Sequence, residues 1–210
     1  EFPDMAHKCF VAFNLRYEPS VDFLKSILKD KSLGKLYKIE AKWKRSIVKD
    51  EKTWYMNKNL SGGGILVDWG VHVIDLIIYL TRENFDFKNI FKQNSQNGIE
   101  NALGIELLSK TGIKFSVDLS WLAKPKVNEN PLEIDFVFKD DRIRWKKSGQ
   151  ILNLSTGSTK NFKKNSNSMY KYFLKTYLTN NQNEDIRNEN FKAYIDVIKI
   201  IDKIYSNALF

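Results

Sequence analysis

The stretch LSGGGILVDWGVHVIDLIIYL, residues 60–80, decides how the rest of the sequence is interpreted. Three glycines lead into a segment built from Ile, Leu, Val and Trp, and this segment nevertheless carries Asp68, His72 and Asp75. The spacing of its apolar residues predicts a helix over about 65–80. Polar groups on such a helix either satisfy a buried helix end or form part of an active site.

The spacing of these polar residues suits proton transfer. Asp68 and His72 are four residues apart, so a helix places them on one face, and Asp75 is close enough to join that face. A carboxylate one turn from an imidazole can fix its tautomer, raise its pKa and leave the other nitrogen free to move a proton. Such pairs are also common in structural positions. The upstream glycines favour a site, because they allow a close backbone approach and a helix N-terminus favours negative charge.

Other catalytic patterns are weak in this sequence. The GGG at 62–64 matches neither GxxxxGK[ST] nor GxGxxG, and it follows a predicted loop rather than a strand. His7 and His72 are the two histidines, and the sequence contains no HExxH or paired CxxC, so we predict no metal site. Cys9 lies in an apolar run and the sequence has no GxSxG, which disfavours nucleophilic catalysis.

A second polar cluster follows residues 8–14, an apolar run that predicts a buried strand. Asn14 and Arg16 come where this strand would end, a usual place for side chains that face a ligand. Arg16 could bind a phosphate, a carboxylate or a nicotinamide-ribose hydroxyl, or it could hold the turn from strand to helix. Trp54 could stack on a sugar ring or anchor a loop.

Composition places the chain among globular proteins. Its 210 residues are 42% hydrophobic, enough for a sizeable core, and one cysteine cannot form an intrachain disulfide. We see no signal peptide, and the longest apolar run, 71–80, is too short to cross a bilayer. We therefore expect a cytoplasmic protein without a membrane partner.

The net charge of +9 raises the question of nucleic acid binding. Of the 34 basic residues, 28 are lysines, and residues 139–175 hold ten Lys and Arg against Asp140 and Asp141, a surplus of eight. This patch could attract a phosphate-bearing partner, but a solvated lysine-rich surface is the simpler interpretation. We predict no nucleic-acid partner.

The remaining periodicity predicts an α+β fold. Helices are expected at 19–30, 65–80, 168–179 and 188–206, and strands at 8–14, 34–45, 86–95, 100–109, 113–121, 132–139 and 142–154. The segments 46–61 and 155–168 are predicted to be loops. SKTG (109–112) and KDDR (139–142) are typical of hairpin turns, so we expect a large open, mainly antiparallel sheet with helices on one face, forming one domain over 1–210.

Several motifs occur in an order that is typical of one protein family. They are VAFNLRYEP (11–19), GKLYKIEAKW (34–43), SGGGILVDWGVHVIDLIIYL (61–80), SWLA (120–123) and IYSNA (204–208). The chain resembles, over about 8–208, the C-terminal domain of the Gfo/Idh/MocA (glucose–fructose oxidoreductase / inositol dehydrogenase / rhizopine-catabolism) family. The most specific element is GGG-x-x-x-D-x-G-x-H at 62–72.

The resemblance implies an activity and a set of site residues. Family members are two-domain NAD(P)-dependent oxidoreductases of sugars, inositols and nucleotide-linked sugars. An N-terminal Rossmann domain holds NAD or NADP, and the C-terminal sheet supplies the substrate pocket and the oligomer interface. By this match His72 would be the catalytic acid/base and Asp68 would orient it. Arg16 would lie near both cofactor and substrate, and Asn14 and Trp54 would contact the sugar-like substrate.

The chain departs from the family pattern in one large respect. The dinucleotide fingerprint and the lysine of the family's E-K-P motif are not in this sequence, since EFPD at 1–4 has Phe2 in place of lysine. The resemblance therefore implies a substrate-binding and oligomerisation domain without a Rossmann domain, inactive by itself and homo-oligomeric through its sheet. The alternative is a stand-alone binding or scaffold protein that pairs with itself or with a separate Rossmann subunit.

Overall fold

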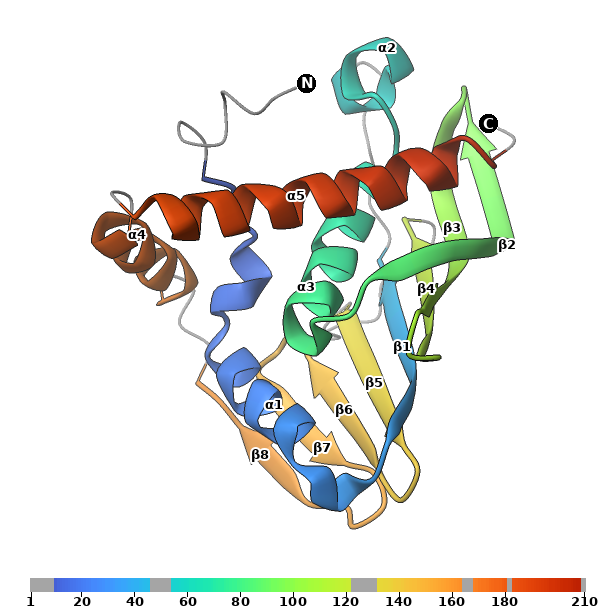
Figure 1. Cartoon of the computed structure of the whole chain (residues 1–210). Coiled ribbons are helices and arrows are strands. Elements are labelled where there is room, and N and C mark those ends of the chain that lie inside the picture. The colour runs from blue at the N-terminus through green and yellow to red at the C-terminus, as the bar shows by residue number, and fades with distance from the viewer. Residues whose placement is uncertain (1–9, 46–53, 122–131, 164–167, 181–182, 209–210) are drawn as a thin grey trace.

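A computed structural model of the chain describes residues 10–45, 54–121, 132–163, 168–180 and 183–208. An eight-stranded sheet in the order β2-β3-β4-β1-β5-β6-β7-β8 carries helices on one face (Figure 1). The strands are β1 (Leu36–Lys44), β2 (Phe85–Gln96), β3 (Ile99–Ser109), β4 (Lys114–Ser120), β5 (Leu132–Phe138), β6 (Arg142–Lys146), β7 (Gln150–Asn153) and β8 (Thr159–Asn161). The helices are α1 (Pro19–Lys29), α2 (Lys58–Ser61), α3 (Val71–Thr81), α4 (Ser168–Asn180) and α5 (Glu184–Tyr205). The predicted α+β class, with an open and mainly antiparallel sheet, is confirmed.

Strand pairing follows the predicted hairpins for most of the sheet. The turns at 109–112 and 139–142 join antiparallel pairs, β3 with β4 and β5 with β6. The exception to antiparallel order is the centre, where β1 pairs in parallel with β4 and aligns Trp43 with Leu119. On its other side β1 pairs with β5 in antiparallel register. The middle of the sheet is therefore built from segments far apart in the sequence.

The segment 142–154 was predicted as one strand and forms two. Gly149 adopts a left-handed φ of +89° between β6 and β7. Its amide donates to the carbonyl of Lys146, which closes the turn. The chain returns as β8 from the segment that was predicted to be a loop. Glycine tolerates the left-handed region without strain, and this explains why the strand ends there.

The core lies between the sheet and its helices. Helix α3 has apolar residues almost all round, as expected of a buried helix, and α5 crosses over it (Figure 1). The buried side chains of the central strands alternate with charged ones on the other face, which is the period of a half-covered sheet. The core residues of these elements include Ile39, Ala41, Trp43, Phe115, Val117, Leu119, Ile74, Ile77, Val197, Ile201 and Ile204.

The strand predicted at 8–14 is wrong over the described residues 10–14. Phe13 has a left-handed φ of 34° and leads into a 3-10 turn, Asn14–Tyr17. The amide of Val11 donates to Asn190 Oδ1 at 2.8 Å, and its carbonyl accepts from Asn190 Nδ2 at 3.1 Å. One side-chain amide of α5 thus satisfies the backbone groups that a neighbouring strand would otherwise satisfy.

Three smaller differences concern helices. The part of the predicted loop that lies within the described residues, 54–61, contains a 3-10 turn (Trp54–Met56) and the short helix α2. Helix α5 begins at Glu184, where the side chain of Asn183 accepts from the Ile186 amide. By length and composition Lys58–Thr81 could cross a membrane, but 67% of its apolar window is buried against the rest of the protein, as in a core helix.

Candidate active site

The glycine run is explained by contacts with the protein itself. A Cβ on Gly63 would lie 2.0 Å from the Tyr205 hydroxyl oxygen, and a Cβ on Gly64 would lie 2.2 Å from the Glu100 carbonyl oxygen. The amides of Gly64 and Leu66 donate to Glu100 Oε1 at 2.9 and 3.0 Å. Tyr205 donates to the same oxygen at 2.7 Å. The close approach that the glycines allow is therefore to Glu100 and Tyr205.

This arrangement fills the start of the helix with a negative charge. Glu100 is 1% exposed, so its carboxylate is an internal partner for the amides at the helix N-terminus. Burial, with Glu100 adding to it, raises the pKa of the Tyr205 hydroxyl far above its usual value. Tyr205 therefore stays protonated and keeps donating. A helix N-terminus occupied in this way does not offer its amides to a ligand phosphate.

Asp68 lies in a π-helical turn, Leu66–Gly70, that precedes α3. π-Turns widen the helix and are frequent at functional sites. Asp68 is exposed, and His72 follows within the first turn of α3. A Cβ on Gly70 would lie 3.2 Å from Leu119 Cδ1, so the glycine lets this turn pack closely against β4. The structure thus places Asp68 and His72 about one turn apart at the start of the helix.

The imidazole of His72 is half-buried and carries an unmade hydrogen bond. Its Nδ1 atom is buried and has no hydrogen-bond partner among the residues that the structure describes. Burial lowers the pKa of His72 below its usual value, and the positive charge of Lys147 lowers it further, whereas Asp68 acts in the opposite direction. The predicted effect of Asp68 is present but smaller than that of burial. His72 is therefore neutral near pH ~7 and able to accept a proton.

Asp75 belongs to a different environment on the same helix. It is 1% exposed and accepts from Arg16 Nε at 2.8 Å and from Arg16 Nη2. Burial raises the pKa of Asp75 to about 6, and the hydrogen bonds from Arg16 offset only part of that rise. The Arg16 guanidinium also lies 4.7 Å from the Phe13 ring centroid and 4.9 Å from that of Tyr79. The ion pair therefore joins the N-terminal turn to α3.

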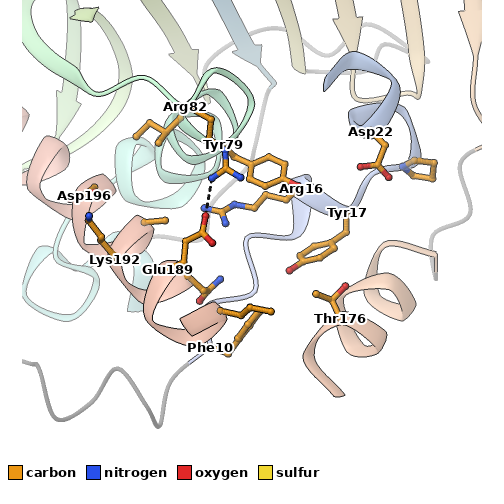
Figure 2. A pocket seen from close by; sticks show the side chains of 15 residues that line it. Phe10, Arg16, Tyr17, Asp22, Tyr79, Arg82, Thr176, Glu189, Lys192 and Asp196 are labelled. Carbon is orange, nitrogen blue, oxygen red and sulfur yellow. Dashed lines mark hydrogen bonds and ion pairs between the residues drawn. The ribbon is translucent and has the colours of Figure 1, made fainter. Parts of the chain in front are cut away.

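A cavity of about 590 Å³ lies at this second end of α3 (Figure 2). Arg16, Tyr17 and Tyr79 line it together with residues of α4 and α5. Arg82 pairs across it with Glu189 at 3.0 Å (Figure 2). Neither Asp68 nor His72 contributes to its lining. Arg16 thus lines this cavity while it binds Asp75 in the middle of α3, whereas Asp68 and His72 lie at the start of the helix.

The other two predicted substrate residues lie in short helical turns. Asn14 begins the 3-10 turn that carries Arg16. Trp54 is 64% exposed and makes an edge-to-face contact with Tyr55 at 5.6 Å between ring centroids. Their roles in substrate binding remain predictions.

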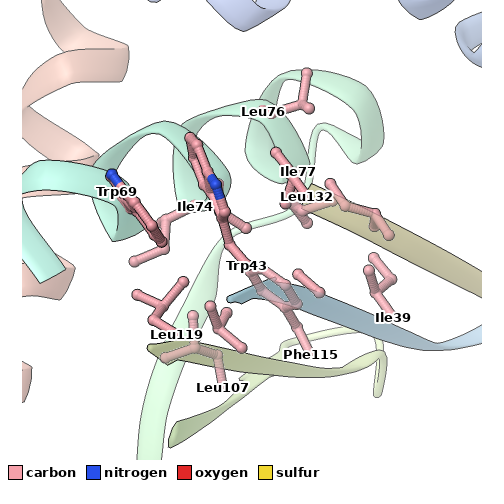
Figure 3. Packing of buried hydrophobic residues seen from close by; sticks show 14 of the residues in the cluster. Ile39, Trp43, Trp69, Ile74, Leu76, Ile77, Leu107, Phe115, Leu119 and Leu132 are labelled. Atoms are coloured by element: carbon pink, nitrogen blue, oxygen red, sulfur yellow. The ribbon is translucent and has the colours of Figure 1, made fainter. Parts of the chain in front are cut away.

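Sequence reasoning missed an aromatic and cationic group beside His72. Trp43 of β1 stacks on Trp69 with 4.7 Å between centroids and 17° between planes (Figure 3). Lys147, which follows β6, places its Nζ 4.7 Å from the Trp43 ring centroid. Trp43 Nε1 is buried and makes no hydrogen bond to the described parts of the chain. Only the strand order brings Lys147 to this place, so no local pattern could have found it.

The sequence and the fold show which family the chain belongs to. The sequence profile of the GFO/IDH/MocA C-terminal domain matches residues 21–144, more than half of the chain. The chain therefore belongs to the Gfo/Idh/MocA family of oxidoreductases and corresponds to its C-terminal domain. A search of curated proteins finds no match.

Three solved structures illustrate the likeness of fold. An aldose-aldose oxidoreductase from Caulobacter crescentus, complexed with glycerol, has a TM-score of 0.67 and 14% identity over 91% of this chain and 61% of its own. An oxidoreductase from Agrobacterium radiobacter, in complex with NAD+, L-tartaric acid and magnesium, has a TM-score of 0.67 and 14% identity over 95% of this chain and 63% of its own. A 3-ketoreductase from Actinomadura kijaniata, in complex with TDP-benzene and NADP, has a TM-score of 0.71 and 11% identity over 92% of this chain and 59% of its own. The chain thus spans about three fifths of the length of these proteins.

The described residues do not fit a dinucleotide. The amides at the start of the π-turn already bind Glu100, and the Arg16 guanidinium already binds Asp75. Within the described segments, neither this helix start nor Arg16 is open to a pyrophosphate. These residues therefore do not form a dinucleotide cradle.

Proposed function

We propose that this chain is the substrate-binding and oligomerisation part of an NAD(P)-dependent oxidoreductase that acts on a hydroxyl of a sugar, an inositol or a nucleotide-linked sugar. The proposal is supported by the family match and by the ligands of the similar structures, which include glycerol, L-tartaric acid and TDP-benzene with NAD+ or NADP. NAD or NADP would be bound by a further domain, and the chain alone would not turn over. We place the protein in the cytoplasm as a homo-oligomer formed through its sheet.

The observation that carries this proposal is the unmade hydrogen bond of a neutral, half-buried His72. A neutral imidazole can take the proton of a substrate hydroxyl during oxidation and return it during reduction. The exposed carboxylate of Asp68, one turn away, would stabilise the imidazolium that forms and would orient the ring. A polar atom that is buried without a partner costs free energy, and a bound hydroxyl would remove that cost.

The remaining predicted residues have supporting roles in this proposal. Asn14, Arg16 and Trp54 would contact the substrate. Arg16 would also approach the cofactor of the further domain while it stays bound to Asp75. Because its guanidinium is bound to Asp75, Arg16 would meet the substrate from one fixed position.

The test begins with the native protein. Antibodies against this chain should detect a band in the source cells above 24.6 kDa, larger by roughly the mass of one more domain. The immunoprecipitated protein should form NAD(P)H with at least one member of a panel of sugars and inositols, and the purified chain should form none. Steady NAD(P)H formation by the purified chain would overturn the need for a further domain.

A stand-alone binding or scaffold protein is the second candidate, and the charged sheet face opposite the helices favours it. Arg142 and Arg144 of β6 both bind Asp135 of β5 at 2.6 Å, and Arg142 also reaches Glu40 of β1 at 3.0 Å. Such an ordered, charge-paired surface could pair with a second copy. A native protein of 24.6 kDa with no oxidoreductase activity, dimeric by light scattering, would favour this alternative.

A further inference from the structure

The start of the π-turn is capped by residues that are distant in the sequence. Its N-cap residue, Ile65, makes no side-chain hydrogen bond, although a polar N-cap residue could satisfy such amides locally. The amides of Gly64 and Leu66 instead donate to Glu100 of β3, which is 36 residues beyond Gly64. Tyr205, the last residue of α5, donates to the same carboxylate oxygen. The cap therefore also fixes the turn relative to β3 and α5.

A β-bulge turns the side chain of Glu100 toward the helices. Leu103 of β3 lies in the core, so regular alternation along the strand would place Glu100 on the opposite face of the sheet. The pairing of β3 with β2 shifts between Glu100 and Ala102, which leaves Asn101 as an extra residue. Bulges re-aim side chains and, like π-turns, are frequent beside active sites. Both irregularities meet at this one carboxylate.

The carboxylate of Glu100 is held in place at a cost in free energy. The side chain is 1% exposed, and its Oε1 atom accepts all three of the hydrogen bonds described above. Its Oε2 atom is buried and has no hydrogen-bond partner within the described ranges. A buried polar atom without a partner is destabilising and needs an explanation. A requirement for exact placement of the turn supplies one.

The hydrogen bonds of this cap continue to Asp68. Gly64 donates its amide hydrogen to Glu100, and its carbonyl accepts from the amide of Asp68 at 3.1 Å. A series of hydrogen bonds thus joins Tyr205, through Glu100 and Gly64, to Asp68. We propose that Tyr205 and Glu100 are positioning residues, which hold the π-turn so that Asp68 lies one turn before His72. The inference rests on the proposed function, in which His72 moves the proton of the substrate hydroxyl.

The electrostatic effect of Asp68 on His72 reports the position of Asp68. Burial and the positive charge of Lys147 lower the pKa of His72, and Asp68 raises it. The attraction between two charges weakens as their distance and their solvent screening increase, so a displaced Asp68 would raise the pKa less. We define the coupling as the change in the pKa of His72 that Asp68→Asn causes.

The coupling can be measured by NMR titration of the histidine side chains in the full chain. The sequence has two histidines, His7 and His72, and the His72→Ala variant assigns their signals. Asp68→Asn should lower the pKa of His72 in the otherwise wild-type chain. It should lower this pKa less in a Tyr205→Phe background, which lacks the donor hydroxyl, and least in a Glu100→Ala background. Glu100→Gln keeps an acceptor oxygen and should retain the coupling.

Two control variants separate positioning from other effects. Glu106→Gln removes an exposed carboxylate from the same strand, and Ile151→Ala removes a buried side chain from β7. Both should leave the coupling unchanged. Equal coupling in the wild type and in Tyr205→Phe would overturn the positioning role, and this variant carries the test if Glu100→Ala does not fold. Absence of coupling in the wild type, or a loss in Glu100→Gln as large as in Tyr205→Phe, would overturn it as well.

The native enzyme offers a second measurement. His72 must be neutral to accept a proton, so the acidic limb of the kcat/KM profile for oxidation follows its pKa. Tyr205→Phe should move this limb to lower pH and should lower kcat more than it changes KM. Coupling that does not depend on Tyr205 would leave the need for His72 in turnover intact. Failure of this inference is therefore distinct from failure of the proposed function, which normal turnover of His72→Ala would show.

Discussion

Two neighbouring turns of α3 use similar polar residues for different purposes. In the middle of the helix Asp75 is fully buried and both of its oxygens bind Arg16. At the start of the helix Asp68 is exposed and His72 retains a buried nitrogen without a partner in the described structure. Buried polar groups are normally paired, so a complete pair indicates a role in stability and an incomplete one indicates a place for a ligand.

The largest expected effect comes from His72, whose hydrogen bonding is incomplete. His72→Ala should lower the turnover of the native enzyme by about 10²–10⁴-fold, the usual cost of removing a general acid/base. Cofactor affinity should stay unchanged, because the described residues near His72 do not form a dinucleotide cradle. Steady-state kinetics and a fluorescence titration with NAD(P)H measure the two quantities. Unchanged turnover would show that His72 is structural, and the proposed difference in role between His72 and Asp75 would be wrong.

The ion pair between Asp75 and Arg16 should instead contribute to the stability of the fold. Asp75→Ala leaves the Arg16 guanidinium buried without its partner, so the free energy of unfolding should fall by about 3–5 kcal/mol. Glu189→Ala is the matched control, because it removes the partner of Arg82 from a pair whose side chains are 63% and 68% exposed. That change should cost about 0–1 kcal/mol. Urea denaturation gives both values, and equal losses would contradict the assignment of Asp75 to stability.

A smaller effect is expected where the helix begins. Gly64→Ala forces a Cβ to within 2.2 Å of the Glu100 carbonyl oxygen, a backbone atom that cannot move aside easily. Overpacking of this kind typically costs about 1–3 kcal/mol. Gly112→Asn is the comparison variant, since a Cβ at Gly112 meets no atom within 4 Å and its cost comes only from the left-handed φ of +92°, which strains asparagine less than other side chains. Similar stability of the two variants in urea would show that the glycine is not needed for this contact.

The smallest expected effect is on the pH dependence of stability, to which His72 and Asp75 should contribute in opposite directions. The pKa of His72 is lowered in the folded state, so its contribution to stability is lost as pH falls from about 6.5 through the folded pKa. The pKa of Asp75 is raised to about 6, so its contribution is lost as pH rises from 3.8 to about 6. In urea denaturation at several pH values, His72→Ala should reduce the loss of stability on acidification, and Asp75→Asn should remove the opposite trend. The same slope in both variants and the wild type would contradict these shifts.

Local patterns in the sequence predicted most of the elements. The apolar period of α3, the alternation in β1 and the turn residues of the β3–β4 and β5–β6 hairpins each act within a few residues. The wrong predictions concern segments whose hydrogen-bond partners are distant in the sequence. The apolar run at 10–13 is not a strand, because Asn190 of α5 satisfies the backbone of Val11.

The candidate site was predicted only where its residues share one helix. The spacing of Asp68, His72 and Asp75 predicted a polar face. It could not show that Asp75 is paired with Arg16, or that Nδ1 of His72 has no hydrogen-bond partner among the described residues. The glycine run suggested a ligand, and its actual neighbours are Glu100 and Tyr205. Lys147 had no local signal at all, because only the order of strands in the sheet brings it beside Trp43.

The position of β1 in the sheet has a consequence for folding. Its two neighbours, β4 and β5, follow it by a long stretch of chain, so β1 has no native neighbour until β4 has been synthesised and stays unpaired on its other edge until β5 follows. Non-local and parallel pairings of this kind form slowly. During that interval β1 is an unpaired strand, and lysines at Lys38, Lys42 and Lys44 occupy one of its faces. Charges placed along an unpaired strand oppose association with other chains, so these lysines protect the nascent protein from aggregation until the centre of the sheet closes.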